Sequence, residues 1–376
     1  MSNLTLILLA AGSSSRFSSD VKKQWLRVGH LPLWQFVANN LANKYNFQKI
    51  IIVGSSQDIE FMKNYTSEYN FVTGGATRQE SLRNALVDVD TPYTLVSDVA
   101  RGCITQKLLN TIIGAKEQGD VVVPYLRVSD TIVYNDQTID RDAVKRIQTP
   151  QLSKTDLLRK ALQTDIEYTD ESSAMVAIGA KRVFVEGDED AHKITYIQDL
   201  NKLPCLQPPS SDILSGNGFD VHEFDTQGKM YLCGIHIDNV SYGFKAHSDG
   251  DVAIHALIDA LLGATGLGDI GMLFPDNDPQ YKGIDSKTLL KEVYAKIIQY
   301  GFTIINIDIT IAAQQPRLAH YKDAMRTKLA EILSLEKARV NVKATTTEKL
   351  GFVGRKEGVA VIANANVKYF NWKDEQ

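Results

Sequence analysis

The sequence predicts an α/β protein of two domains, for three reasons. The chain has 376 residues, and a single hydrophobic core rarely grows past about 250 to 300 residues. From residue 4 to about residue 200, apolar strand-like runs alternate with helical segments, which is typical of a mostly parallel sheet with helices on both faces. From residue 214 onward, strands and helices follow the less regular order of an α+β domain.

The first half supplies both kinds of element in alternation. The strand-like runs span 4–9, 49–53, 93–96, 120–124 and 182–185, and the helical segments span 33–42, 79–86, 106–115 and 154–161. Ligands of such sheets bind beyond the carboxyl ends of the strands. We therefore expect chemistry in the loop that follows the first strand.

That loop contains the small residues Ala10, Ala11 and Gly12, and Arg16 and Lys23 follow them. Small residues let backbone N–H groups approach a phosphate closely, and the two cations add positive charge where a triphosphate would lie. The loop is neither a P-loop nor a dinucleotide fingerprint. From spacing alone, a serine-rich surface turn with two solvated cations explains it equally well.

Residues 203–211 mark the domain boundary, because their three prolines and two serines cannot continue a helix or a central strand. We predict a first domain over 1–203, a linker over 204–213 and a second domain over 214–376. The elements predicted in the second domain are a strand through 216–222, a hairpin over 230–237, helices from 248, over 286–299 and over 321–333, and strands over 303–312, 339–344 and 358–367.

The second domain offers a candidate metal site. On its first strand, Asp220 and His222 share a face because side chains alternate along a strand. A helix that begins at an N-cap near Ser248, with Asp251 in the capping-box position, places His255 on the same face as Asp251. Asp220, His222 and His255 together suit zinc with a fourth position open. The alternative is that Asp251 only caps the helix and that His255 is a buried core imidazole.

Two further polar groups each allow two interpretations. Asp269 and Asp276 either form a carboxylate pair or satisfy backbone donors in a glycine-rich loop. The stretch from Thr345 to Glu348 ends a strand with three hydroxyls and a carboxylate. This combination fits contacts with phosphate and Mg²⁺, but it also fits a helix cap.

The composition excludes several kinds of function. A net charge of −4 and a pI near 6.0 give no general attraction to nucleic acid or to an anionic membrane, and no apolar run reaches the ~18 residues of a membrane span. Cys103, Cys205 and Cys233 are far apart, so we expect neither a disulfide framework nor a cysteine zinc site. A cytoplasmic location fits these cysteines, and the apolar start of the chain is a buried strand rather than a secretory signal.

The first half resembles the 2-C-methyl-D-erythritol 4-phosphate cytidylyltransferases, which implies a Rossmann-like nucleotidyltransferase domain. The resemblance rests on Leu8–Gly12 with Arg16 and Lys23, and on further matches at 24, 74–75, 78, 81, 96–101, 130–131, 140–141, 149–151, 169–171, 185–187 and 193. The sequence departs from the pattern at Ser13–Ser15, where many relatives have a glycine, at Ser97, where histidine is common, and at Ala76, which is often acidic.

This resemblance implies roles for named residues. Arg16 and Lys23 would bind the phosphates of CTP, which Mg²⁺ would accompany, and positioning with charge neutralisation would drive the transfer. The resemblance also implies that cytidine is bound by Ala10, Ala11, Gly12, Gly75 and Ser81. It places Thr131, Arg141 and Lys193 at the acceptor phosphate, and it implies that Asp98 binds substrate.

The second half resembles the 2-C-methyl-D-erythritol 2,4-cyclodiphosphate synthases over roughly residues 214–369. The matching motifs are Gly218–His222, Ala246–Asp251 with His255, Asp269–Gly271, Leu273–Asp276, and Lys343–Phe352 with Gly354 and Arg355. The resemblance implies zinc on Asp220, His222 and His255, and a second divalent ion, Mg²⁺ or Mn²⁺, on Glu348. The residues implied in the substrate pocket are His247, Ser248, Asp269, Asp276, Ala313, Arg317, Thr346, Phe352 and Arg355.

Together the two halves resemble the family in which both enzymes are fused, acting in the non-mevalonate isoprenoid pathway. Two alternatives stay open: the first half is a non-catalytic CTP-binding or assembly module, or the chain is a zinc-dependent phosphohydrolase joined to a nucleotide-binding domain. The expected partners are small molecules and further copies of the chain. Synthases resemble trimers and transferases resemble dimers, so a fused chain could close as a hexamer.

One departure in the second half predicts altered regulation. Some relatives carry a glutamate that, with the arginine matching Arg355, lines a cavity able to hold isoprenoid diphosphates, and Ile362 stands in that place here. We expect weak or altered binding of such diphosphates. Titration calorimetry that detects tight binding of geranyl diphosphate would contradict this prediction.

Overall fold

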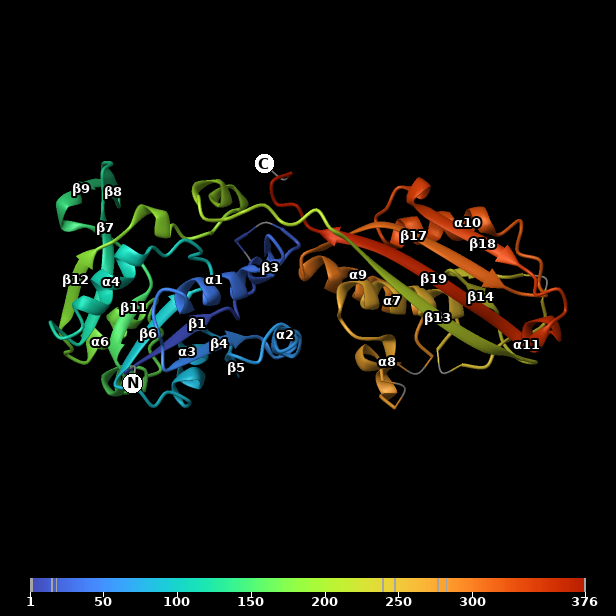
Figure 1. Cartoon of the computed structure of the whole chain (residues 1–376), viewed down its shortest axis with the longest axis horizontal. Helices are drawn as coiled ribbons and strands as arrows, with labels where there is room; N and C mark the ends of the chain where they lie inside the picture. Colours follow the sequence, from blue (N-terminus) through green and yellow to red (C-terminus); the bar gives the residue numbers. More distant parts are fainter. Residues whose placement is uncertain are drawn as a thin grey trace. The chain divides into compact units, whose positions relative to one another are not determined.

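The computed structural model describes residues 3–14, 16–17, 19–238, 240–246, 248–275, 277–281 and 283–374 (Figure 1). The chain forms two compact units: the residues up to Pro209 together with the segment from Asn371 onward, and Ser210–Phe370. We expected the second domain to run to residue 376, so the return of the C-terminal segment to the first unit is a correction. Among the described residues, no helix is both long and apolar enough to cross a lipid bilayer.

The first unit is built on an eight-stranded sheet with the order β10-β7-β11-β6-β1-β4-β5, and β12 pairs with β7. Only β10 and β11 run against the other strands, which confirms the prediction of a mostly parallel sheet. The strands are β1 (Leu4–Leu9), β4 (Lys49–Gly54), β5 (Asn70–Thr73), β6 (Tyr93–Asp98), β7 (Val121–Arg127), β10 (Lys145–Ile147), β11 (Gln151–Lys154) and β12 (Arg182–Glu186).

Helices and two small hairpins complete the first unit. The central strand β1 is buried along its whole length, as expected for a strand covered on both faces. The helices are α1 (Leu33–Ala42), α2 (Ser56–Met62), α3 (Arg78–Leu86), α4 (Gln106–Gly114), α5 (Thr155–Ala161) and α6 (Glu171–Ala177), with a short 3-10 turn η1 at Lys23–Trp25. The hairpins are β2 (Arg27–Val28) with β3 (Leu31–Pro32), and β8 (Ile132–Tyr134) with β9 (Gln137–Ile139), which lies at the edge of the unit (Figure 1).

The second unit is a five-stranded sheet covered on one face by helices, with the order β16-β13-β19-β17-β18. Its strands are β13 (Ile213–Asp225), β16 (Gly243–Phe244), β17 (Phe302–Ala312), β18 (Val340–Thr345) and β19 (Gly358–Tyr369). Its helices are α7 (Val252–Thr265), α8 (Ile270–Leu273), α9 (Ser286–Gln299), α10 (Lys322–Ile332) and α11 (Gly351–Gly354), and β14 (Tyr231–Leu232) pairs with β15 (Ile235–His236). This arrangement confirms the predicted α+β pattern.

Two glycines let strand β13 lie directly against helix α7. A Cβ atom on Gly216 would lie 2.0 Å from the carbonyl oxygen of Ala260, and a Cβ atom on Gly218 would lie 1.9 Å from that of Ala256. Only glycine fits this close backbone approach. The approach matters because the strand carries Asp220 and His222 and the helix carries their partner.

Helix α7 begins three residues later than predicted. Its N-cap is Asp251, whose carboxylate accepts from the backbone N–H of Ile254, so the expected cap at Ser248 is wrong. The same buried carboxylate accepts from the N–H groups of Cys233 (2.9 Å) and Gly234 (2.6 Å). A residue that satisfies three backbone donors stabilises the helix start more than a hydroxyl on the chain before it. Asp251 is therefore a capping residue, in line with the alternative set out for it above.

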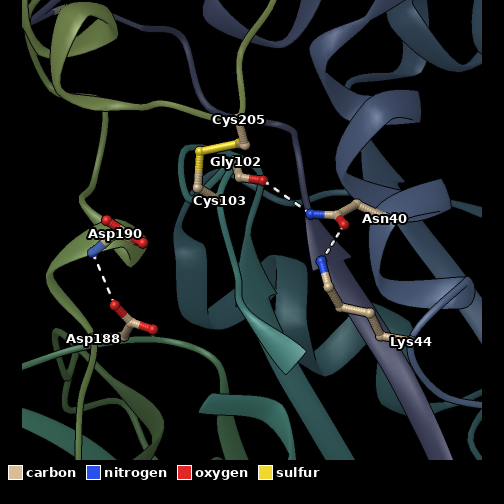
Figure 2. Close-up of a disulfide and its surroundings, with 7 residues drawn as sticks. All are labelled: Asn40, Lys44, Gly102, Cys103, Asp188, Asp190 and Cys205. Carbon is tan, nitrogen blue, oxygen red and sulfur yellow. Dashed lines mark hydrogen bonds between the residues drawn. A yellow bond between two sulfur atoms is a disulfide. The ribbon is translucent and has the colours of Figure 1, made fainter. Parts of the chain in front are cut away.

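A disulfide joins Cys103 and Cys205, with a Cα–Cα distance of 5.6 Å (Figure 2). The expectation of unpaired cysteines is wrong for this pair, while Cys233 is free and buried. The bond ties the start of the Pro-rich segment to the loop after β6. Gly102, next to Cys103, also contacts helix α1: the Asn40 side chain donates to the carbonyl of Gly102 at 3.2 Å (Figure 2).

The C-terminal segment is anchored in the first unit by Trp372. Its side chain is 1% exposed, and its indole N–H donates to the carbonyl of Arg27 at 2.8 Å. We predict that Trp372→Ala lowers the free energy of unfolding of the first unit by ~3–5 kcal/mol, as for other buried tryptophans. Hydrogen exchange of β1 and β6 measures this, with β13 and β19 as the internal reference. Unchanged exchange in the first unit would contradict the anchor, and Trp372→Phe should show a smaller effect.

Candidate active sites and their geometry

The first unit contains a cavity of about 440 Å³ where β1 and β6 end. This volume lies in the range of small-molecule sites, and the position is the one expected for an open α/β sheet. Of the predicted site residues, the cavity is lined by Ala11, Gly12, Arg16, Lys23, Gly75, Ser81, Asp98 and Lys193. Ala10 is buried beside the cavity and does not line it.

Lys23 is a partly buried lysine of this cavity whose pKa is strongly lowered. Its ammonium group donates to the carbonyl of Ile194 at 2.6 Å. Burial, followed by the positive charges of Lys193 and Arg16, lowers the pKa of Lys23 to about 8. Clustered cations in a partly buried site disfavour one another's charge and strongly favour an anionic ligand.

Buried Asp58 on α2 positions the segment that carries Lys23. Its carboxylate accepts from the Lys22 ammonium (3.1 Å), the Gln24 amide (3.2 Å) and the Trp25 indole (3.1 Å). Burial alone would raise the pKa of Asp58, but the charge of Lys22 and the bond from Trp25 lower it. Three donors on one carboxylate fix both neighbours of Lys23.

We predict that Asp58→Ala lowers the free energy of unfolding of the first unit by ~3–5 kcal/mol, because a buried ion pair loses one partner. We also expect weaker binding of the ligand of Lys23, measured as a raised KM. The matched control is Asp156→Ala, since Asp156 is 98% exposed and pairs with Arg159 on the neighbouring turn of the same helix. Equal stability losses in the two variants would contradict the assignment.

A charge network links Arg78, Asp98 and Lys193, which all line the cavity. Asp98 accepts from Arg78 (3.1 Å) and from Lys193 (2.6 Å), and Arg78 also pairs with buried Glu171 at 2.5 Å. Burial would raise the pKa of Asp98, but Arg78 and then Lys193 hold it well below its usual range. The network holds Lys193, which lines the same cavity as Lys23.

Thr131 and Arg141 lie outside this cavity. Both are exposed and flank the β8–β9 hairpin, and the Arg141 side chain donates to the carbonyl of Ser129 at 2.7 Å. Neither residue is among those that line the cavity. Within one chain, the structure therefore does not bring them together with Arg16, Lys23 and Lys193.

In the second unit, Asp220, His222 and His255 form a group whose ligand atoms all lie within 4.8 Å of one another. The Nδ1 atoms of both imidazoles are 3.3 Å from Oδ2 of Asp220. Asp220 and His222 share the face of β13 toward α7, while Phe219 and Val221 are exposed on the other face. The predicted alternation is confirmed.

The donor set fits a divalent metal. The Nδ1 atom of His222 is buried and has no hydrogen-bond partner among the described residues, and a buried ring nitrogen of this kind needs an explanation. Burial would raise the pKa of Asp220, but the adjacent imidazoles of His222 and His255 lower it to about 2. Three converging ligands with one open position are the pattern of a catalytic metal site.

The other predicted site residues that the structure describes in the second unit are not part of the Asp220, His222 and His255 group. The Thr346 hydroxyl donates to the Glu348 carboxylate at 2.8 Å, and Glu348 is not in the Asp220 group. Asp269 is exposed and caps α8 by accepting from the N–H of Met272. Ala313 is buried, Arg317 and Phe352 are exposed, and Arg355 pairs with Glu357 at 2.9 Å. His247 and Asp276 lie outside the described residues.

Residues 4–204 match the 2-C-methyl-D-erythritol 4-phosphate cytidylyltransferase family, and residues 213–368 match the YgbB family. The chain is 64% identical over 369 residues to the bifunctional enzyme IspD/IspF of Sulfurimonas denitrificans, which covers 98% of this chain and 95% of that relative. This chain belongs to the bifunctional IspD/IspF family. The Campylobacter curvus member is 55% identical over 99% of this chain and 100% of its own length.

A solved structure of this family has the same fold. The bifunctional IspDF of Campylobacter jejuni superposes with a TM-score of 0.92 at 49% identity, covering 99% of this chain and 100% of the other. The chain thus carries an IspD cytidylyltransferase domain followed by an IspF cyclodiphosphate synthase domain, as the motifs predicted. A non-catalytic first unit is not favoured by these matches.

Proposed function

We propose that the cavity of the first unit binds CTP with its phosphates on Arg16 and Lys23, and that Lys193 binds the acceptor phosphate. The observation that carries this assignment is that Arg16, Lys23 and Lys193 line one cavity. Burial, followed by the charges of Lys193 and Arg16, lowers the pKa of Lys23. An oxygen of methylerythritol phosphate attacks the α-phosphorus of CTP, the bond to the β-phosphate breaks, and pyrophosphate leaves. The cations neutralise the charge that develops on the phosphate oxygens. Mg²⁺ would accompany the triphosphate.

The rest of the cavity suits the nucleoside. Small residues at Ala11, Gly12 and Gly75 leave room for a base beside backbone groups, and the Ser81 hydroxyl accepts from the N–H of Gly75 at 3.0 Å. Asp98 also lines the cavity, and its carboxylate accepts from Arg78 and Lys193. Ser13 and Ser14, two of the serines that depart from the family pattern, also line the cavity.

Thr131 and Arg141 act in the cavity of a second copy under this proposal. Both are exposed beside the β8–β9 hairpin and absent from their own chain's cavity. A two-fold dimer through the hairpin would supply Arg141 as a further cation for the acceptor phosphate. A mixture of Arg141→Ala and Lys23→Ala chains should then regain transferase activity, because a mixed dimer holds one intact site. No recovery on mixing would contradict this arrangement.

We infer that Asp220, His222 and His255 hold a zinc ion and that Glu348 holds a second divalent ion, Mg²⁺ or Mn²⁺. When bound, such ions supply positive charge that polarises phosphoryl oxygens and orients a diphosphate. The 2-phosphate of diphosphocytidyl methylerythritol 2-phosphate attacks the β-phosphorus, and CMP leaves. On this proposal Ser248 donates to a phosphate oxygen, and Thr346 lines the pocket while its hydroxyl donates to Glu348. His247, Asp269, Asp276, Ala313, Arg317, Phe352 and Arg355 complete the pocket for the sugar and the cytosine.

The exposed face of the second sheet fits a trimer. Phe219 is 60% exposed, Val221 45% and Ile362 45%, and Phe219 lies opposite Ile362 in register. Apolar side chains gathered on one sheet face are typical of a protein interface. Three copies would cover this face, and dimers through the first unit would extend the trimer to a hexamer. Sedimentation equilibrium that returns a monomer would contradict the assembly.

The test of the proposed function is ³¹P NMR of the purified protein. With CTP, Mg²⁺ and methylerythritol phosphate, we expect pyrophosphate and a cytidyl diphosphate diester. With diphosphocytidyl methylerythritol 2-phosphate, we expect CMP and a cyclic diphosphate. Release of inorganic phosphate instead would favour a phosphohydrolase. If CTP stays intact, the first unit is a non-catalytic binding module.

A further inference from the structure

The two ring nitrogens of His255 face different surroundings. Nδ1 lies 3.3 Å from Oδ2 of Asp220, on the side of the proposed metal. Nε2 lies 3.0 Å from the hydroxyl of Ser286, at the start of α9, and 3.2 Å from the hydroxyl of Ser248. A neutral imidazole has one donor and one acceptor nitrogen, so the contacts at Nε2 decide what Nδ1 can do.

The Ser286 hydroxyl is itself held by a carboxylate. Ser286 is fully buried, and its oxygen lies 2.5 Å from Oδ1 of Asp249. A carboxylate only accepts, so the one proton of the Ser286 hydroxyl goes to Asp249. The hydroxyl oxygen can then only accept from Nε2–H of His255. The Ser248 hydroxyl already accepts from the N–H of Gly250 at 3.1 Å and can accept from the same Nε2–H.

We propose that Asp249 and Ser286 are positioning residues that fix His255 as the Nε2–H tautomer and leave the lone pair of Nδ1 for the metal. The inference rests on the proposed metal centre and deepens it. The direction of hydrogen bonding runs from His255 to Ser286 and from Ser286 to Asp249. Outer partners of this kind orient a ligating imidazole and raise its basicity.

The test is zinc affinity, measured by competition with a chromophoric chelator on the full-length protein with Zn²⁺ alone. Ser286→Ala removes the acceptor for Nε2–H, and we expect the Kd for zinc to rise about 10- to 100-fold. Asp249→Asn weakens the hold on the hydroxyl proton and should raise the Kd less. The double variant should be no weaker than Ser286→Ala, because the two residues act through one hydrogen-bond chain.

The matched control is Thr265→Ala. Thr265 is a buried residue on α7, the helix of His255, and its hydroxyl donates to carbonyls of its own helix at Leu261 and Leu262. We expect its zinc Kd to stay within twofold of wild type. Visible absorption of the Co²⁺ form gives a second readout, and Ser286→Ala should change the band shape whereas Thr265→Ala should not.

The outcomes separate this inference from the metal centre it rests on. Wild-type protein that binds no stoichiometric zinc would overturn the metal centre. Wild-type zinc binding with unchanged affinity in Ser286→Ala, or additive losses in the double variant, would overturn the positioning chain alone. If Ser286→Ala does not fold, Asp249→Asn decides: a raised zinc Kd with an altered Co²⁺ spectrum supports the chain, and wild-type values overturn it.

Discussion

Replacing Lys23 by alanine should lower the rate of cytidylyl transfer by about 10²- to 10³-fold, the effect of removing one preorganised charge from a phosphoryl site. The synthase reaction should keep its wild-type rate, since Lys23 belongs to the first unit. Release of pyrophosphate and of CMP measures the two reactions. The control is Lys63→Ala, because Lys63 is 55% exposed and pairs with Glu60 on the surface. A variant that keeps its transferase rate would contradict the role of Lys23.

The lowered pKa of Lys23 adds a pH dependence with a defined sign. A lysine with a pKa of about 8 is charged below pH 8 and neutral above it, so kcat/KM for CTP should fall about tenfold per pH unit above 8. Lys23→Arg keeps its charge at all these pH values. Its kcat/KM should therefore be lower at pH 7 and nearly flat to pH 9.5. Parallel profiles for the two proteins would show that another group titrates.

Removing a metal ligand should have the second large effect. His222→Ala deletes one of three converging ligands, and we expect loss of stoichiometric zinc and a fall in synthase rate on the order of 10³-fold, because several kcal/mol of charge stabilisation are lost. Transferase activity should not change. Zinc content by mass spectrometry and CMP release measure the effect. His236→Ala is the control, since His236 is an exposed histidine on β15 of the same unit; a similar loss there would point to misfolding.

Local sequence patterns predicted the residues at the centre of each site. They did not predict the residues that position those side chains. Asp220 and His222 share a face because strand side chains alternate, and Leu4–Leu9 is buried because all its residues except Thr5 are apolar. The capping error arose because Ser248 and Asp251 are both good N-caps. Contacts with Cys233 and Gly234 favour Asp251, and these contacts are long-range.

The residues that position the site side chains could not be predicted from local sequence patterns, because they are distant in sequence from the residues they contact. Asp58 lies 33 residues from Trp25 in sequence, and Ser286 lies 31 residues from His255. The cysteine pair is separated by 102 residues, so its proximity follows from the fold alone.

Two short helices, α2 and α6, were also missed. Their caps at Ser55 and Asp170 were visible in the sequence, but seven residues are too few to show a helical period.

The central claim is that one chain carries two chemically independent active sites. ³¹P NMR can follow both reactions in one sample that contains both sets of substrates and millimolar Mg²⁺. A zinc-selective chelator is then added. We expect CMP and cyclic diphosphate formation to stop while pyrophosphate release continues at its earlier rate. Loss of both reactions together, or of neither, would contradict two separate sites of which only the second uses zinc.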